Sequence, residues 1–276
     1  MPVGTRPAHL AATGLVLAAL SLLSVPAGAG SAPSRSQAGS APPANSQAWV
    51  PALPPLPVPL VGPRPEVLSS TRPPYTGKLE IPEVVWPGHE AVAARVDAAI
   101  DAWMAHRVRL FAVEVRHDLA HSHNLPPSLP PSTLAITFRV TDLTPQVASF
   151  LLEVEPYFRG ENAPAELPAG LTFQLPGARR VTLASLFRPG SGYLSLLSRL
   201  SLHALQRFSP AKARCYVGPG GPPATASSFE AWALSPVGLV LSFPAGQYTA
   251  AYCGPPTITI PFSALRTVLR AFPPLP

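Results

Sequence analysis

Proline restricts the fold of this chain more than any other residue type. Of its 276 residues 39 are prolines, roughly three times the ordinary share. Each proline lacks a backbone N–H donor and is excluded from helix interiors, so a long all-helical bundle is ruled out. Only 12% of the residues are charged and 47% are hydrophobic. The chain can therefore bury a sizeable core, and disorder throughout is excluded as well.

The prolines concentrate in one segment. Eleven of them fall between Ala41 and Pro74, and the composition from Ser31 onward is mainly Pro, Ala, Ser and Gly without periodicity. Such a composition favours extended polyproline II and buries no core. We therefore expect residues 30–74 to be a disordered linker. A ligand for a proline-binding module, or a spacer that lifts a domain off an envelope, are the alternatives.

An apolar run at Leu10–Val25 precedes the proline-rich segment. Pro26 ends this run, and Ala27 and Ala29 are the small residues that a signal peptidase requires. The pattern predicts a secretory signal peptide at residues 1–29, cleaved after Ala29. An uncleaved anchor is the alternative, since about 20 apolar residues can cross a bilayer. Because no later apolar run is long enough, we expect the mature protein to have no membrane span and to be secreted, periplasmic or in the cell envelope.

Residues 75–276 are expected to form one domain. Apolar residues recur at helical spacing from Pro87 to His117 and again from Tyr193 to Phe208. Strands are predicted at 133–141, 147–155, 171–175, 180–183, 229–234, 239–243 and 257–260, and a short terminal helix at 262–270. Helices and hairpins are interleaved without a βαβ rhythm. The predicted class is α+β: a mainly antiparallel sheet with a long N-terminal helix and a second helix packed on it.

Cys215 and Cys253 are the only cysteines. In an exported protein an even count indicates a disulfide, and two cysteines allow one pairing. The loop they enclose is long enough for a stabilisation of roughly 4 kcal/mol by the chain-entropy treatment. A metal pair, which lacks companion ligands here, and a catalytic thiol are the alternatives.

A histidine cluster follows the first predicted helix. His117 and His121 lie four residues apart, so on a helix both imidazoles would share one face, a spacing known from metal sites. His123 and Asp118 could add ligands. However, no glutamate follows the first histidine as in a metalloprotease, and a helix C-terminus favours histidine for dipole reasons alone. We favour a solvated helix end, and a metal site at His117, His121 and His123 remains the alternative.

No residue pattern argues for an enzyme or a nucleic-acid binder. Glu153 and Glu155 would share one face of a predicted strand, either as a carboxylate pair or as a solvated strand face. No nucleophile elbow, phosphate-binding, dinucleotide or zinc-ribbon spacing occurs. Of the 20 basic residues only Lys78 and Lys212 are lysines, which fits a GC-rich coding bias. Because the arginines are dispersed rather than interleaved with aromatics, a nucleic-acid partner is disfavoured.

The C-terminal segments resemble the RsiV-like extracytoplasmic domain family. The resemblance extends over about 79–269, and the motifs that carry it lie at Val181–Ser191, Phe229–Phe243, Gln247–Pro255 and Thr257–Phe262. This family occurs in the lysozyme-sensing anti-sigma factor RsiV, beside some peptidoglycan deacetylase domains and in secreted mycobacterial immunogenic proteins. The Tyr157 loop departs from the family pattern, since it lacks the family's histidine. The few residues before the apolar run would also be too short for a sigma-binding segment.

The resemblance implies an exported, non-enzymatic binding or sensing domain of the bacterial envelope without a cofactor. Its ligand would be an envelope component or a secreted protein, with lysozyme-type proteins the first candidate. The implied ligand-binding residues are Tyr157, Tyr248 and Tyr252, which in the alternative interpretation complete the core beside the disulfide. A metal-dependent envelope hydrolase using the 117–123 cluster and a purely structural envelope spacer are the other hypotheses. The sequence does not specify the oligomeric state or whether the host has one membrane or two.

Overall fold

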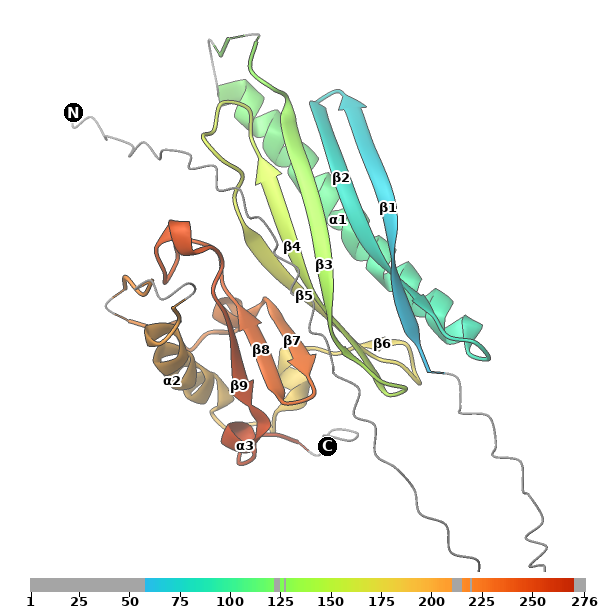
Figure 1. Cartoon of the computed structure of the whole chain (residues 1–276), viewed down its shortest axis with the longest axis vertical. Helices are drawn as coiled ribbons and strands as arrows, with labels where there is room; N and C mark the ends of the chain where they lie inside the picture. The colour runs from blue at the N-terminus through green and yellow to red at the C-terminus, as the bar shows by residue number, and fades with distance from the viewer. Residues whose placement is uncertain (1–57, 122–124, 127, 210–214, 219, 271–276) are drawn as a thin grey trace, which may run out of the picture. The chain divides into compact units, whose positions relative to one another are not determined.

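The structure is a computed structural model that describes residues 58–121, 125–126, 128–209, 215–218 and 220–270. This part of the chain contains two β-sheets, mostly antiparallel, and three α-helices (Figure 1). The mixed class with a mostly antiparallel sheet, which the sequence predicts, is confirmed. The predicted signal peptide, most of the predicted linker and His123 lie outside the described residues.

The first sheet has six strands in chain order. They are β1 (Leu60–Thr71), β2 (Pro74–Val85), β3 (Ser132–Leu143), β4 (Val147–Tyr157), β5 (Leu167–Gln174) and β6 (Arg179–Arg180). The β2–β3 pair is parallel because α1 (Glu90–His121) connects these strands, and the other pairs are antiparallel hairpins. The antiparallel pairing of β3 with β4 and of β5 with β6 follows the strand pattern of the sequence.

The first strand lies within the segment expected to be a linker. The predicted linker end at Pro74 and domain start at residue 75 are therefore wrong: regular structure begins at Leu60. Pro63 faces Pro82 in an uninterrupted ladder, so this pair is one of those that exchange no hydrogen bonds. The nitrogen of Pro63, and that of Pro65 two residues on, consequently face the free edge of the sheet. Edge strands accept proline for this reason, which composition alone does not reveal.

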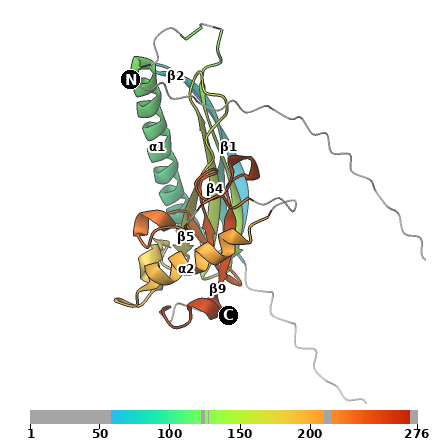
Figure 2. The ribbon, with the colours of Figure 1, turned by 90° about the vertical axis from the view of Figure 1, so that its left-hand side faces the viewer.

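The α1 helix covers one face of the six-stranded sheet, as Figure 2 shows. Its buried residues contact alternate residues of β2, β3 and β4, which follows from the two-residue period of a strand. The helix contributes Ala93, Val96, Ile100, Met104, Phe111 and Val115, and the strands Leu79, Ile81, Leu134, Ile136, Phe150, Leu152 and Val154. The helix begins and ends a few residues later than the predicted 87–117. None of the described helices has a stretch both long and apolar enough to cross a membrane.

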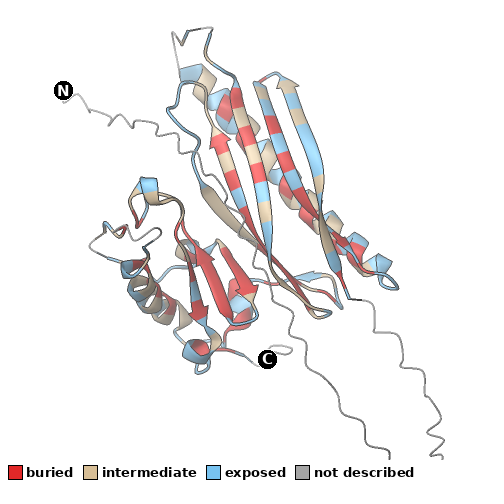
Figure 3. Cartoon of the chain, viewed as in Figure 1, coloured by how far each residue is buried: buried red, intermediate tan, exposed pale blue. Residues whose placement is uncertain are grey.

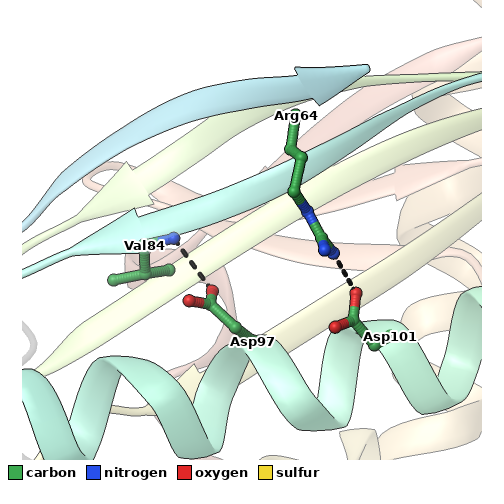
Figure 4. A network of polar contacts seen from close by, with 4 residues as sticks. All are labelled: Arg64, Val84, Asp97 and Asp101. Atoms are coloured by element: carbon green, nitrogen blue, oxygen red, sulfur yellow. Dashed lines mark hydrogen bonds and ion pairs between the residues drawn. The ribbon is translucent and has the colours of Figure 1, made fainter. Parts of the chain in front are cut away.

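The pairing of β2 with β3 ends at Leu79. Beyond that residue, the carboxylate of Asp97 on α1 accepts a hydrogen bond from the backbone of β2. Val84 lies two residues after Pro82 on β2, so its pair likewise exchanges no hydrogen bonds with β1. The N–H of Val84 therefore points away from β1. That N–H donates to Asp97 Oδ1 at 2.9 Å (Figure 4). Partial burial raises the pKa of Asp97. One helical turn later, Asp101 forms an ion pair with Arg64 of β1.

The second sheet has three antiparallel strands, β7 (Trp232–Ser235), β8 (Gly238–Ser242) and β9 (Thr257–Pro261). The helices α2 (Tyr193–Gln206) and α3 (Phe262–Leu265) pack on it and share a second hydrophobic core. Two predicted bounds are corrected. Phe229 ends a 3₁₀ turn and the strand begins at Trp232, and the terminal helix ends at Leu265 rather than at residue 270.

The two sheets meet at β4, β5 and β7. Gly170 on β5 touches the backbone of β7, since a Cβ there would lie 1.7 Å from the carbonyl oxygen of Trp232. Leu151 of β4 packs with Ala233 and Val240 in a small apolar cluster at the same junction. The second sheet therefore covers the part of the sheet face opposite α1 that contains Leu151 and Gly170. Buried and exposed residues alternate along most of β2, whereas residues 147–152 of β4 are all buried, because the second sheet covers their other face (Figure 3).

Candidate functional site

The face of the first sheet opposite α1 carries a row of polar residues where the second sheet does not cover it. Glu153, Glu155 and Tyr157 alternate on β4 with the buried residues Val154 and Pro156, so the three side chains share the face opposite α1. The same-face arrangement of the two glutamates, predicted from their spacing, is therefore present. Their cross-strand neighbours on β3 are Thr137, Ala135 and Thr133.

A groove of about 340 Å³ opens on this face. One wall comes from the sheet and contains Arg139, Glu153, Glu155, Glu166, Leu167 and Pro168; the other contains Phe208, Pro255 and Thr257. The last pair in the β4–β5 ladder is Val154 with Leu167. Glu166 lies one residue before Leu167, and this register brings it beside Glu155. The β4–β5 hairpin thereby assembles a third carboxylate next to the two of the predicted pair.

The lining of the groove contains more negative than positive side chains. Partial burial raises the pKa of Glu166, and repulsion from Glu155 and Glu153 raises it further. Arg139 is the basic residue of the lining, and its guanidinium donates to Thr257 Oγ1 at 3.2 Å. Within the described ranges, no ion pair neutralises any of the three glutamates. This concentration of negative charge contrasts with the formal net charge of +6 of the whole chain.

A cross-linked loop borders the groove. Cys215 and Cys253 form a disulfide with a Cα–Cα distance of 6.0 Å, as the sequence predicts. Tyr252 lies in the 3₁₀ turn at Ala251–Cys253, and its side chain is 75% exposed. A Cβ on Gly254 would lie 3.9 Å from Glu166 Oε2, so the loop reaches the carboxylates. The site thus combines an exposed aromatic ring on a cross-linked loop with an acidic groove.

The three tyrosines predicted to bind a ligand have different surroundings. Tyr248 is buried in the second core, where its ring packs edge-on against Phe243 at 5.3 Å and burial raises its pKa. Tyr157 is half-buried at the end of β4, on the face that bears Glu153 and Glu155. Only Tyr252 is largely exposed. The alternative interpretation, in which these tyrosines complete the core, therefore fits Tyr248 and does not fit Tyr252.

The histidine cluster lies at the end of α1, away from the residues of the groove. The rings of His117 and His121 stack at 4.1 Å between centroids, and His121 Nδ1 donates to the His117 carbonyl at 2.7 Å. That hydrogen bond occupies one of the four ring nitrogens. Among the residues that the structure describes, no group of three His, Cys, Asp or Glu side chains is arranged to hold a metal ion.

Glu166 and Arg139 are the residues of the site that the sequence did not indicate. Glu166 follows a proline-containing loop without strand periodicity, and Arg139 is one dispersed arginine among many. The strand-face argument that found Glu153 and Glu155 would have found Arg139 if β3 and β4 had been aligned in register. Glu166 requires the register of β4 with β5, for which no turn motif gave a signal.

The second sheet and its helices match a known family profile. The profile described as "Protein of unknown function (DUF3298)" matches residues 184–263. This segment includes α2, β7 to β9 and the Tyr252 loop, and it excludes the three glutamates of the groove. None of the curated proteins is similar enough to this chain to count as a match.

Two solved structures of DUF3298 proteins are similar to this chain. One is a DUF3298 family member from Bacteroides fragilis NCTC 9343, with 13% sequence identity, a TM-score of 0.51 and coverage of 77% of this chain and 93% of that chain. Another, from Pseudomonas aeruginosa PAO1, has 13% identity, a TM-score of 0.46 and coverage of 79% of this chain and 95% of that chain. The likeness to the first covers 77% of this chain and concerns the fold alone.

Proposed function

We propose that this chain is an exported, non-enzymatic binding domain of the bacterial cell envelope, whose acidic groove and Tyr252 loop bind a basic region of a protein ligand. One observation carries the proposal. Three carboxylates without an ion-pair partner in the described structure lie beside a disulfide-linked loop, which reaches them at Gly254 and also carries the exposed Tyr252. The net charge of the whole chain is of the opposite sign.

The arrangement has the properties of a protein-binding surface. Exposed tyrosines supply a large contact area at a low entropy cost, and aromatic residues are enriched among the side chains that dominate binding energy. The disulfide fixes Cys253 next to Tyr252, so less freedom is lost when a ligand binds. Besides burial, repulsion from Glu155 and Glu153 raises the pKa of Glu166, and cationic groups of a partner would relieve that repulsion.

The ligand class follows from this charge and from the family resemblance. A basic protein surface complements Glu153, Glu155 and Glu166, and the resemblance to the RsiV-like domain makes lysozyme-type proteins the first candidate. An envelope component with ammonium groups is the alternative ligand. Tyr157 lies on the same face of β4 and extends the proposed contact. Tyr248 supports the loop from the core and is not expected to touch the ligand.

Calorimetric titration of the whole purified chain with lysozyme tests the proposal. We expect saturable binding that weakens as the salt concentration rises, because the paired charges are screened. Glu166→Gln and Tyr252→Ala should each weaken binding, by about tenfold for the tyrosine, which corresponds to about 1.4 kcal/mol. Glu83→Gln removes the same charge from an exposed site on β2 outside the groove and should leave affinity unchanged.

Two outcomes would contradict the proposal. Binding that responds equally to Glu83→Gln and Glu166→Gln would show a general charge effect rather than a site. Absence of binding to lysozyme and to a polycationic peptide alike would exclude the basic-ligand class altogether.

A further inference from the structure

A second pocket, of about 440 Å³, lies between α1, β5, β6 and the segments just before β7 and just after β8. The side chains that matter for its chemistry are Trp103, His106, Arg107, Arg180, Glu230 and Pro244. Leu167 and Pro168 of β5 line both this pocket and the acidic groove. The two sites therefore share a wall but have different charged residues.

The charge of this pocket is opposite to that of the groove. Two arginines and a histidine line it together with a single carboxylate, that of Glu230. Neither Arg107 nor Arg180 forms an ion pair with any carboxylate of the described chain. Both arginine side chains thus line a concave site without an ion-pair partner among the described residues.

Arg107 is held in place and has unused hydrogen-bonding capacity. Its guanidinium carbon lies 5.9 Å from the centre of the Trp103 ring, over the indole face. Its Nε is buried and has no hydrogen-bond partner in the described part of the structure. This cation–π contact with Trp103 restrains the guanidinium before a ligand arrives.

Arg180 supplies the second guanidinium from β6. Desolvation lowers its pKa, which is the direction expected for a cation that lacks a neutralising neighbour. The neighbouring residue Arg179 points to the opposite side of the strand, where it donates to Gln174 Oε1 at 2.7 Å. Of these two adjacent arginines, only Arg180 lines the pocket.

We propose that this pocket is an oxyanion site, in which Arg107 and Arg180 bind the carboxylate or phosphate group of a small organic ligand. Guanidinium groups match the geometry of both oxyanions through paired N–H donors. Trp103, Pro168 and Pro244 give the pocket an apolar surface on which the remainder of the ligand can pack. The site is distinct from the groove proposed above, because its charged residues are different and it takes a ligand of opposite charge.

Inorganic phosphate and acetate are the probes that separate the two oxyanion chemistries. The whole chain is titrated calorimetrically with each at constant ionic strength, with chloride as the reference anion. Arg180→Gln should weaken binding by about tenfold, the loss typical of one charge-assisted interaction. Glu230→Gln should strengthen it, because the only negative charge of the lining is removed. Arg179→Gln is the matched control and should leave the affinity unchanged.

The opposite effects of the Arg180 and Glu230 variants separate a binding site from a structural role. Saturable binding of phosphate alone or of acetate alone would identify the oxyanion, and binding of both would identify the shared chemistry. The proposal is overturned if neither probe binds saturably, or if Arg179→Gln weakens binding as much as Arg180→Gln. Circular dichroism of each variant verifies that it is folded. Because Arg180 is exposed, its variant remains informative even if Arg107→Gln does not fold.

Discussion

The hydroxyl oxygen of Ser149 on β4 accepts a hydrogen bond from the backbone N–H of Leu234 on β7, at 2.8 Å. The same oxygen is 2.8 Å from Thr172 Oγ1 on β5, and all three residues are buried. This polar contact lies where the second sheet packs on the first, next to the close approach of Gly170 to Trp232. One serine thus connects strands from both cores.

Replacing this serine tests how much the junction contributes to stability. Ser149→Ala leaves the buried N–H of Leu234 without an acceptor, so we expect a loss of about 1–3 kcal/mol in the free energy of unfolding. Urea unfolding followed by circular dichroism measures it. Ser185→Ala removes an exposed hydroxyl that donates to the Thr182 carbonyl and should cost less than about 0.5 kcal/mol. Equal effects of the two variants would argue against a stabilising junction.

The disulfide is expected to affect both stability and binding. Replacing Cys215 and Cys253 by alanine should lower the free energy of unfolding by about 2–4 kcal/mol, since the unfolded chain gains freedom. The variant should also bind lysozyme more weakly, because the loop at Tyr252 loses its anchor. Thiol labelling of the denatured, unreduced parent should give no signal. Two labelled cysteines in that experiment would contradict the bond.

The raised pKa of Glu166 predicts a pH dependence of binding. This carboxyl takes up a proton at a higher pH than an ordinary glutamate, whose pKa is 4.5. Affinity for a basic ligand should therefore begin to fall, as the pH is lowered, while free glutamate is still ionised. Glu166→Gln should remove that step in titrations carried out over a series of pH values. A parent whose affinity is independent of pH would refute the role of this carboxylate.

Stability should show the opposite sign at the same residue. A pKa raised by folding means that the folded state favours the protonated form, so the contribution to stability is present below the ordinary pKa and is lost as the pH rises through the folded value. At neutral pH the ionised Glu166 is therefore unfavourable for folding. Glu166→Gln should raise the urea midpoint near pH 7 while it weakens binding. A lowered midpoint would indicate that the carboxylate has a structural role.

The histidines at the end of α1 are expected to be dispensable. Replacing His117, His121 and His123 by glutamine should change the free energy of unfolding by less than about 1 kcal/mol, as for ordinary surface changes. Lysozyme binding by this variant should match the parent. Elemental analysis of the purified parent is the decisive measurement. About one metal ion per chain, lost together with stability in the variant, would favour the hydrolase hypothesis instead.

Export is tested by the N-terminus of the mature protein. Cleavage after Ala29 should leave Gly30 as the first residue, because Pro26 ends the apolar run just before the small residues of the cleavage site. Mass spectrometry of the secreted or envelope fraction identifies this residue directly. A mature chain that begins at Met1 or Pro2 would exclude cleavage and favour an anchor.

Local periodicity was sufficient to predict most of the elements. The branched and apolar runs that became β3 and β4 predicted both strands and their pairing, and the apolar spacing from Tyr193 predicted α2. Periodicity failed for β1 because its prolines outweighed the alternation of its side chains, and the strand β2 was not predicted either. Whether a strand tolerates proline depends on whether the proline nitrogen faces solvent or a neighbouring strand. That depends on the pairing of the strand and not on the segment itself.

The candidate site was predictable only where its residues share one strand. Glu153 and Glu155 share β4, so their common face follows from spacing alone. Glu166 joins them through the register of a hairpin, and the pocket at Arg107 and Arg180 requires the packing of α1 against β5. Tyr248 and Tyr252 are four residues apart and indistinguishable as a pattern. Only the tertiary structure places one in the core and the other in solvent.

The prolines of β1 determine how other chains can approach this protein. A free sheet edge attracts further strands because it presents alternating donors and acceptors. Here the edge lacks the donors of Pro63 and Pro65 over the middle of the strand, so an incoming β-strand would find carbonyls without matching N–H groups. Edge-to-edge aggregation and recognition of a partner by strand addition are both disfavoured. Partners that approach this edge are therefore expected to bind through side chains, and an abundance of proline that suggested a lack of structure protects an edge of the folded sheet.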